Sequence, residues 1–215
     1  MTERNREQSL YNRVIKRGID VLLAAIILIV LSPLLLLLVL AIKLDSRGPV
    51  LFSQQRVGVN KVIFPIYKFR TMRIDTPHDV PTHMLENPNQ YITRVGRFLR
   101  ATSLDELPQL WNILIGQMSF VGPRPALWNQ EDLIAQRELY RANAVRPGLT
   151  GWAQINGRDE LEIPVKAKLD GEYVKKLSFP FDLKCFFGTF VYVLKRKGVV
   201  EGGTGELQRQ EKQKK

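Results

Sequence analysis

The longest hydrophobic stretch of the chain runs from Val21 to Ile42 without a charged residue, and only Ser32 and Pro33 interrupt it. A straight helix over this stretch would reach roughly 33 Å, which matches a hydrocarbon core of ~30 Å. A buried core helix would normally keep a polar side in a protein this small. The pattern therefore predicts a segment that inserts into a membrane.

The flanks of this segment and Pro33 bear on its topology. Proline removes a backbone donor and clashes with the carbonyl four residues earlier, and Ser32 can hydrogen-bond a freed carbonyl. The flanking basic residues are Arg4, Arg6, Arg13, Lys16 and Arg17 before the stretch and Lys43, Arg47, Arg56 and Lys61 after it. The positive-inside rule assigns both flanks to the cytoplasm. A kinked spanning helix and a re-entrant helix bent at Ser32-Pro33 both remain open, and the charges favour re-entry.

The rest of the chain alternates between short strand-like and helical patterns. Apolar and polar positions alternate over 61–72, which predicts a β-hairpin that turns around 57–60. Helical patterning covers the ranges 104–115, 130–143 and 166–176, whereas 146–158 is glycine-rich and irregular. The proline-rich range 74–90 predicts a long loop, either a lid or disorder. Aromatic and aliphatic residues over 181–197 end in three basic residues, which suits an interfacial helix on acidic lipid as well as a core helix.

Composition narrows the chemistry. The 215 residues include 32 Lys and Arg against 21 Asp and Glu, a net charge of +11, with one Cys and two His. A single cysteine excludes an intramolecular disulfide framework and a cysteine-based zinc site. The charge favours an anionic partner: nucleic acid, a phosphorylated substrate or an acidic membrane.

Asp105 and Glu106 are the most chemically suggestive pair. Ser103 and Glu106 have the spacing of a capping box that starts the helix continuing through Leu107, and spacing alone favours this structural interpretation. The functional interpretation is that the adjacent carboxylates, close to Arg100, form a site for a divalent cation and phosphate.

Several cations stand in settings that suit phosphate binding. Arg124 lies between two prolines, which would present its guanidinium rigidly, and Arg146 opens a run with two glycines and a threonine. We interpret Arg70 as structural, whereas Lys68 fits either role. Together these cations suit a diphosphate substrate.

Five motifs in one order resemble the bacterial sugar transferases, the small monotopic phosphoglycosyl transferases that initiate capsule and surface-glycan assembly. They are Ser32-Pro33, Tyr67-Lys68-Phe69-Arg70-Thr71-Met72, Thr102-Ser103-Leu104-Asp105-Glu106-Leu107-Pro108-Gln109, Met118-Ser119-Phe120-Val121-Gly122-Pro123-Arg124-Pro125 and Arg146-Pro147-Gly148-Leu149-Thr150-Gly151-Trp152-Ala153-Gln154. The resemblance covers roughly residues 8–200, and the chain looks like the minimal catalytic form of the family.

The resemblance implies transfer of a phosphosugar from a UDP-sugar to a polyprenol phosphate, undecaprenyl phosphate, with release of UMP. It makes Asp105 the nucleophile that forms an aspartyl-phosphosugar intermediate and Glu106 its dyad partner, the two acting with Mg²⁺ as its ligands. We expect phosphate binding from Lys68, Arg100 and Arg124, and nucleotide contacts from Arg146, Gln154 and Arg158. Asp170 matches a further acidic position of the family and is expected to bind substrate.

The resemblance also implies a mostly helical α+β fold. We expect a re-entrant membrane helix over 1–47, a small catalytic domain with a β-hairpin and interfacial amphipathic helices over 48–200, and a flexible tail over 201–215. The expected location is the cytoplasmic face of the bacterial inner membrane. Membrane lipids and downstream glycosyltransferases are the expected partners, and nucleic acid is not.

Two rival functions and the identity of the sugar stay open. One rival is a membrane-tethered basic scaffold, although no nucleic-acid motif appears. The other is a polytopic-type sugar-phosphate transferase with a single displacement, against which the single hydrophobic segment argues. Segments 74–77 and 125–130 look similar to capsule-initiating members, which favours an N-acetylated UDP-sugar over UDP-glucose or UDP-galactose.

Overall fold

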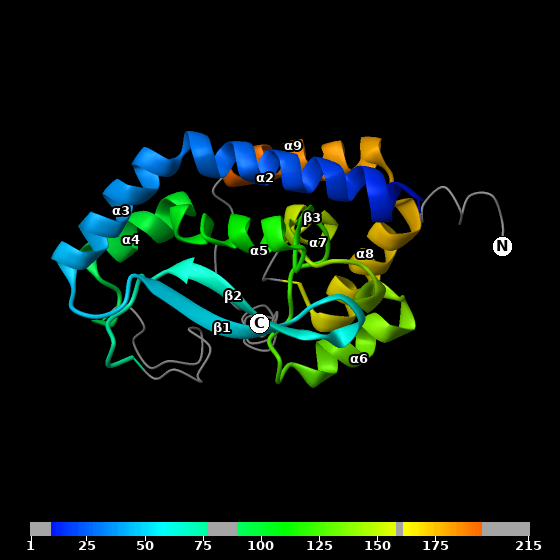
Figure 1. The fold of residues 1–215 in the computed structure, drawn as a ribbon. Coiled ribbons are helices and arrows are strands. Elements are labelled where there is room, and N and C mark those ends of the chain that lie inside the picture. The colour runs from blue at the N-terminus through cyan, green and yellow to red at the C-terminus, as the bar shows by residue number, and fades with distance from the viewer. Residues whose placement is uncertain (1–9, 77–89, 158–160, 195–215) are drawn as a thin grey trace.

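The computed structural model of the chain describes residues 10–76, 90–157 and 161–194 (Figure 1). The described helices are η1 (Tyr11–Ile15), α2 (Lys16–Val30), α3 (Ser32–Asp45), η2 (Val59–Lys61), α4 (Arg94–Thr102), η5 (Leu104–Glu106), α5 (Gln109–Ile115), α6 (Glu131–Leu139), η6 (Ala142–Ala144), α7 (Trp152–Ile155), α8 (Ile163–Lys176) and α9 (Phe179–Leu194). The described strands are β1 (Leu51–Val57), β2 (Ile63–Phe69), β3 (Ser119–Val121) and β4 (Gly148–Thr150). The predicted tail 201–215, Arg158 and most of the predicted 74–90 loop lie outside the described residues.

The arrangement confirms the predicted mostly helical α+β class. Helices α2 and α9 lie along one side of the molecule, α4 and α5 lie beneath them, and the β1–β2 hairpin is on the opposite side (Figure 1). Strands β3 and β4 form a second small sheet.

The N-terminal hydrophobic stretch forms two helices, and the pair is bent by 63° at the break between Val30 and Ser32. Pro33 lacks the N–H that would bond the carbonyl of Ile29, and the Ser32 hydroxyl donates to that same carbonyl at 2.7 Å. The hydroxyl thereby satisfies the carbonyl that proline leaves without its helical partner. Within the described ranges, no helix taken alone has the length and hydropathy to cross a membrane, whereas the bent pair reaches both when taken together.

Helix α2 belongs to the core on one side and exposes apolar residues on the other. Ala24 is fully buried in the main hydrophobic cluster, together with Leu110 and Ile113 of α5. On its other side, Ile26 and Ile29 are about half or more exposed. The helix therefore stabilises the domain while keeping an apolar surface.

The predicted hairpin is confirmed. Strands β1 and β2 pair antiparallel, with a register that runs from Leu51 opposite Phe69 to Val57 opposite Ile63. The turn between them, η2, contains Asn60 at a φ of 52°, a left-handed conformation that asparagine tolerates better than most residues.

Helix α4 was not predicted. Thr93 caps it, because its hydroxyl accepts from the N–H of Gly96 at 2.9 Å. A Cβ at Gly96 would lie 2.0 Å from the carbonyl oxygen of Thr71, so glycine is required where α4 crosses the end of the hairpin. The signal was present in the sequence, because Val95, Phe98 and Leu99 have the i, i+3, i+4 spacing of a helix face, although the stretch is only nine residues long.

The β3–β4 sheet was also not predicted, because both strands are three residues long. They pair parallel, with Ser119 opposite Gly148 and Val121 opposite Thr150. A Cβ at Gly148 would lie 2.1 Å from the amide nitrogen of Gly122, so these glycines let the two segments approach closely. The range 146–158, expected to be irregular, therefore contains β4 and α7.

The other helix predictions differ from the structure mainly at their ends. The range 104–115 is divided into η5 and α5, and 130–143 into α6 followed by a separate turn, η6. Helix α8 begins three residues earlier than predicted, at Ile163, and α9 begins at Phe179.

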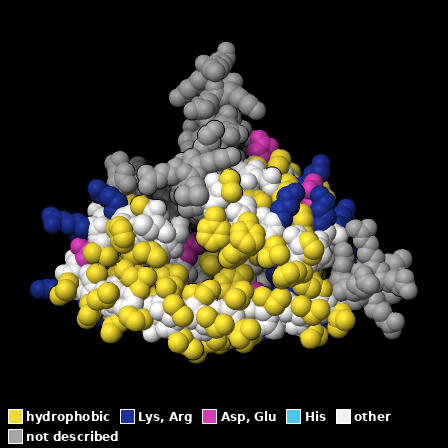
Figure 2. Space-filling model, turned by 90° about the horizontal axis from the view of Figure 1, so that it is seen from above, with side chains coloured by type: hydrophobic (Ala, Val, Ile, Leu, Met, Phe, Trp, Pro, Cys, Tyr) yellow, Lys and Arg dark blue, Asp and Glu magenta, His cyan; other side chains and the backbone are white. Residues whose placement is uncertain are grey.

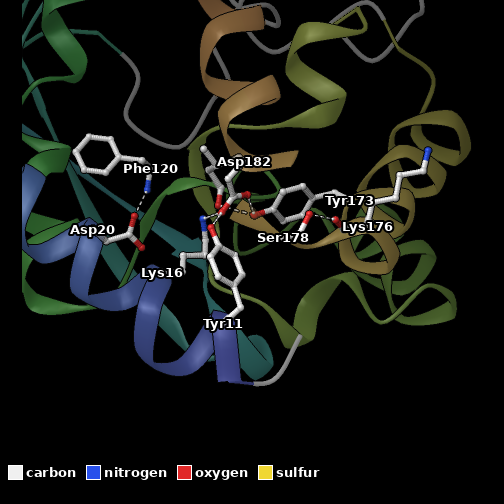
Figure 3. Close-up of polar contacts among 9 residues, drawn as sticks. Tyr11, Lys16, Asp20, Phe120, Tyr173, Lys176, Ser178 and Asp182 are labelled. Carbon is white, nitrogen blue, oxygen red and sulfur yellow. Dashed lines mark hydrogen bonds and ion pairs between the residues drawn. The ribbon is translucent and has the colours of Figure 1, made fainter. Parts of the chain in front are cut away.

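A buried polar cluster around Asp182 joins η1 and α2 to the last two described helices (Figure 3). The Asp182 carboxylate accepts hydrogen bonds from Tyr11 at 2.7 Å, Lys16 at 2.6 Å and Tyr173 at 2.7 Å. Burial and then the Asp182 charge raise the pKa of Tyr173, which therefore stays protonated as a donor. One carboxylate thus connects η1, α2, α8 and α9.

Candidate active site

The carboxylates of Asp105 and Glu106 lie in η5, a single turn between α4 and α5. Ser103, which ends α4, has a φ of 56°, and its side chain makes no capping hydrogen bond. The predicted capping box is therefore wrong. The left-handed backbone at Ser103 ends α4 and begins η5. The carboxylate of Glu106 pairs with side chains from other elements.

Glu106 holds two cations. Its Oε1 accepts from Nζ of Lys68 at 2.9 Å and from Nη2 of Arg124 at 3.0 Å. The Lys68 and Arg124 side chains are 15% and 26% exposed, and that of Glu106 is 12% exposed. Two cations thus converge on one carboxylate oxygen at a partly open site, beside Asp105, which is 4% exposed.

The loop that carries Arg124 is fixed by backbone contacts on both sides. The carbonyl of Pro123 accepts from the N–H of Gly148 at 2.9 Å, and the carbonyl of Pro125 accepts from Arg56 at 3.1 Å. The flanking prolines limit the backbone further. The expected rigid presentation of this guanidinium therefore has a clear structural basis.

Arg70, which we interpret as a structural residue, is hydrogen-bonded to the backbone of another segment. Its guanidinium donates to the backbone carbonyl of Ser46 at 2.7 Å and also to that of Arg47. These bonds connect the end of β2 to the chain that leaves α3.

The other predicted binding residues lie in several elements. Arg100 is in the last turn of α4, shortly before Ser103. Arg146 donates from Nε to the carbonyl of Gly116 at 3.1 Å. Burial, and then the neighbouring charge of Arg146, lower the pKa of Arg17. The Arg17 guanidinium is also close to Gly116, so Arg146 and Arg17 approach the same turn after α5.

Asp170 lies in α8, with its side chain 1% exposed and its Oδ2 at 2.7 Å from Nη2 of Arg137 in α6. Burial raises the pKa of Asp170 and outweighs the opposing effect of the Arg137 charge. The contacts of this carboxylate join α6 to α8, and its predicted role in substrate binding stays a prediction.

Two buried amides have polar atoms without a hydrogen-bond partner in the part of the chain that the structure describes. Gln154 in α7 is 7% exposed, and neither polar atom of its side chain has a partner among the described residues. Gln109 is 3% exposed, its Nε2 has no partner, and it begins α5 about one turn after Asp105. Buried polar groups are normally paired, so both are candidates for contact with a bound molecule. Gln109 stood in a quoted motif but was not predicted as a site residue.

The carboxylates suit a divalent cation that arrives with its substrate. Among the described residues, no three or more His, Cys, Asp or Glu side chains gather in a way that could hold a metal ion. Mg²⁺ is usually held by one or two carboxylates, with substrate phosphates and water completing its shell. The adjacent carboxylates of Asp105 and Glu106 fit that pattern.

Comparison with known proteins decides the family. The model of the bacterial sugar transferase family matches residues 11–196. The chain belongs to this family. The resemblance carried by the five motifs is thereby confirmed.

Curated relatives of the chain include named sugar-phosphate transferases. The chain is 43% identical over 191 residues to the UDP-glucose:undecaprenyl-phosphate glucose-1-phosphate transferase of Escherichia coli (strain K12), covering 83% of this chain and 40% of that relative. It is 36% identical to the undecaprenyl-phosphate galactose phosphotransferase of Salmonella typhimurium, covering 87% of this chain and 42% of that protein. The chain thus spans well under half the length of both transferases.

A relative of similar size is the exopolysaccharide production protein PSS of Rhizobium leguminosarum bv. phaseoli. It is 42% identical over 195 residues, which cover 85% of this chain and 96% of that protein. The sugars named among these relatives are glucose and galactose, so the expected preference for an N-acetylated sugar finds no support in the names.

Proposed function

We propose that this chain transfers a phosphosugar from a UDP-sugar to undecaprenyl phosphate, which yields polyprenyl-diphosphate-sugar and UMP and begins surface polysaccharide or glycoconjugate synthesis. The names of the family relatives support this activity. The structural observation that carries it is the pair of cations, Lys68 and Arg124, on one oxygen of Glu106 beside Asp105.

Phosphoryl transfer depends mainly on positioning and on charge stabilisation. Glu106 holds Lys68 and Arg124 in position, so they need little reorganisation to meet a diphosphate. Arg100 in the neighbouring helix is the third cation that we assign to phosphate binding. Glu106 keeps the first two cations together and partly neutralises them.

The proposed reaction has two displacements. A carboxylate oxygen of Asp105 attacks the β-phosphorus of the UDP-sugar, and the bond to the bridging oxygen breaks so that UMP leaves with that electron pair. A phosphate oxygen of undecaprenyl phosphate then attacks the same phosphorus, and the Asp105 carboxylate leaves. The low exposure of Asp105, 4%, would protect the acyl phosphate from water.

Mg²⁺ is part of the proposal, with Asp105 and Glu106 as its protein ligands. When bound, the cation would neutralise charge on the diphosphate oxygens. Arg146, Gln154 and Arg158 are assigned to the nucleotide side, and Asp170 remains a further candidate for substrate binding. The unpaired amide of Gln154 supports its assignment.

The contacts at both ends of the bent helix pair support re-entry. At the start of α2, Arg17 donates to the carbonyls of Ile113 and Leu114 at 2.6 and 2.8 Å. At the end of α3, the Asp45 carboxylate accepts from the N–H of Val95 at 3.0 Å. Both ends are thus bonded to the same folded domain, so they lie on one side of the bilayer if the bend inserts into it.

An apolar surface supports interfacial placement. Figure 2 shows hydrophobic side chains spread over the face of α2, α3 and α9, with Lys and Arg side chains at its margins. Exposed apolar residues on these helices include Leu22, Ile29, Leu37, Leu44, Phe187 and Phe190. Monotopic proteins bind membranes through apolar surface buried at the acyl boundary and through cations attracted to acidic headgroups. We therefore assign the domain to the cytoplasmic face of the inner membrane.

The function is tested with purified protein, Mg²⁺, undecaprenyl phosphate and a panel of UDP-sugars, with UMP detection. We expect sustained UMP release only with the lipid, and one equivalent of UMP per enzyme without it. Asp105→Asn should abolish both, while a mass increase equal to the phosphosugar should map to Asp105 in the unsubstituted protein. Robust turnover by Asp105→Asn would remove the nucleophile assignment. If no UDP-sugar gives UMP, the membrane-tethered scaffold becomes the favoured function. Turnover without a covalent intermediate would favour a single displacement.

The topology is tested with reporters fused to each end. We expect both reporters to be cytoplasmic in the unsubstituted protein, and the N-terminal reporter to become partly periplasmic when Ser32 and Pro33 are both replaced by alanine. Alanines at Leu36 and Leu37, two exposed residues of α3, are the matched control and should leave the topology unchanged. A periplasmic N-terminus in the unsubstituted protein would show that the pair crosses the membrane.

A further inference from the structure

Strand β2 has one edge paired with β1 and another that faces α5. In the described sheets, β1 and β2 form a two-stranded unit, so the second edge of β2 has no strand beside it. The N–H of Tyr67 and the carbonyl of Pro65 point from this edge toward α5, where both have a partner. Pro65, which has no N–H to offer, occupies a position where proline is tolerated in a strand.

The partner is the side chain of Asn112, which is fully buried. Its Oδ1 accepts from the Tyr67 N–H at 3.1 Å, and its Nδ2 donates to the Pro65 carbonyl at 2.8 Å. The second Nδ2 hydrogen is used as well, because Gln117 Oε1 accepts from Nδ2 at 2.7 Å. One amide thus pairs with the Tyr67 N–H and the Pro65 carbonyl, as a neighbouring strand would.

This contact lies between the two segments that carry the ion pair of the site. Lys68 directly follows Tyr67 in β2, and Glu106 lies three residues before Gln109, where the helix that carries Asn112 begins. The ammonium of Lys68 sits on a flexible four-carbon stem, so the ion pair alone does little to determine where its backbone lies. The amide of Asn112 fixes that backbone against α5.

We propose that Asn112 is a positioning residue for Lys68. It fixes the position of β2 along α5 so that the Lys68 ammonium reaches Glu106. Resting on the proposed function, the same position lets Lys68 contact the diphosphate of the UDP-sugar. Asn112 touches neither substrate nor the reacting atoms in this role. It acts through Lys68.

A purely structural role makes a different prediction. Removing Asn112 leaves the Tyr67 N–H and the Pro65 carbonyl buried without partners, which destabilises the fold whether or not Lys68 matters. Loss of activity in a single variant would therefore decide nothing. The informative quantity is the coupling between Asn112 and Lys68, measured as a double-mutant cycle.

The cycle compares the unsubstituted protein with Asn112→Ala, Lys68→Met and the double variant, by kcat and KM for UDP-sugar and by the thermal midpoint of unfolding. We expect Asn112→Ala to lower kcat by about 10- to 100-fold when Lys68 is present. In the Lys68→Met background the same change should lower kcat less than about threefold, while the midpoint falls equally in both backgrounds. An equal loss of kcat in both backgrounds would overturn the proposal.

Asn143→Ala is the matched control. Asn143 is also a buried asparagine, and its Nδ2 donates to the carbonyl of Ile134 at 3.0 Å and to Glu138 at 2.8 Å, both in α6 and not in β2. We expect it to lower the midpoint without any coupling to Lys68→Met. Coupling as large as that of Asn112 would mean that the cycle reports general loosening, which would also overturn the proposal.

A second readout does not depend on turnover. The ¹⁵Nζ resonance of Lys68 reports its contact with Glu106, and we expect Asn112→Ala to shift it toward that of an exposed lysine, whereas Asn143→Ala leaves it in place. If the unsubstituted protein releases no UMP, the proposed function fails and this spectrum still tests the positioning. An unchanged Lys68 resonance in Asn112→Ala would refute the positioning alone.

Discussion

The ammonium nitrogen of Lys68 lies 2.9 Å from Oε1 of Glu106, although the two residues are 38 positions apart in the chain. Arg124 donates to the same oxygen at 3.0 Å. The three side chains come from a strand, a single helical turn and a loop, which meet only because the hairpin packs on α5. Glu106 thus places the cations of Lys68 and Arg124 next to each other.

Replacing Glu106 by glutamine keeps the shape of the side chain and removes its charge. We expect UMP release to fall by at least about 100-fold, because Lys68 and Arg124 lose the charge that orders them. The thermal midpoint measured alongside should fall less than that of Asp170→Asn, because Lys68 and Arg124 are partly exposed and water can replace part of the lost contact. A fall in midpoint large enough to unfold the protein at assay temperature would contradict this assignment.

The left-handed backbone at Ser103 predicts an unusual response to substitution. We expect Ser103→Gly to stabilise the protein by up to about 1 kcal/mol, because glycine adopts this conformation without strain. Ser103→Val should destabilise it by at least about 1 kcal/mol. Denaturant unfolding measures both.

Thr93→Ala is the natural comparison, because Thr93 does cap a helix through Gly96. It should cost about 1 kcal/mol, whereas Ser103→Ala should cost much less because no capping bond is lost. Equal losses from the two alanine variants would restore the capping box at Ser103.

The buried pair of Asp170 and Arg137 predicts a large effect on stability. Asp170→Asn or Arg137→Met alone should cost about 3–5 kcal/mol, because each leaves a buried charge without its partner. The double variant should be more stable than either single one. If Asp170→Asn instead keeps its unfolding midpoint and loses binding of UDP-sugar, its main role is with the substrate.

Cys185 offers a pH-dependent probe of the Asp182 cluster. Burial, with a further contribution from the Asp182 charge, raises the pKa of this thiol from 9.0 to about 12. The reactive thiolate is therefore roughly a thousandfold scarcer at pH 8 than in a free thiol. Because the thiol is also fully buried, labelling by maleimide should be slow at pH 8 and should keep rising above pH 9, where labelling of a free thiol levels off.

The same probe reports loss of the cluster. Asp182→Asn should speed labelling of Cys185 at pH 8, because it removes a negative charge that disfavours the thiolate and loosens the contact with Lys16. Asn143→Ala serves again as the control that leaves Cys185 slow. Rapid labelling of the unsubstituted protein at pH 7 would show that the thiol is neither buried nor shifted.

Elements with a strong local pattern could be predicted from the sequence. The hairpin follows from alternation around a short turn, and α8 and α9 follow from their apolar spacing. Ser32-Pro33 indicated where the apolar stretch bends, because the missing N–H of Pro33 and the hydroxyl of Ser32 act on a carbonyl within the same helix. These are effects of residues a few positions apart.

Elements that depend on distant partners could not be predicted. Strands β3 and β4 are too short to show a period, and they exist because Gly122 and Gly148 allow two remote segments to touch. Ser103 and Glu106 fit a capping box by spacing, but Lys68 and Arg124 compete for the carboxylate, and neither is close to it in the chain.

The order of motifs by itself identified the family, the candidate carboxylates and the cations, because these depend on residue type and spacing. Only the tertiary structure decided which of them meet: Lys68 and Arg124 at Glu106, Asp170 with Arg137, and Lys16 with Asp182. The physical reason is that side-chain electrostatics act over a few ångströms, and those distances are set by the packing of elements far apart in the chain.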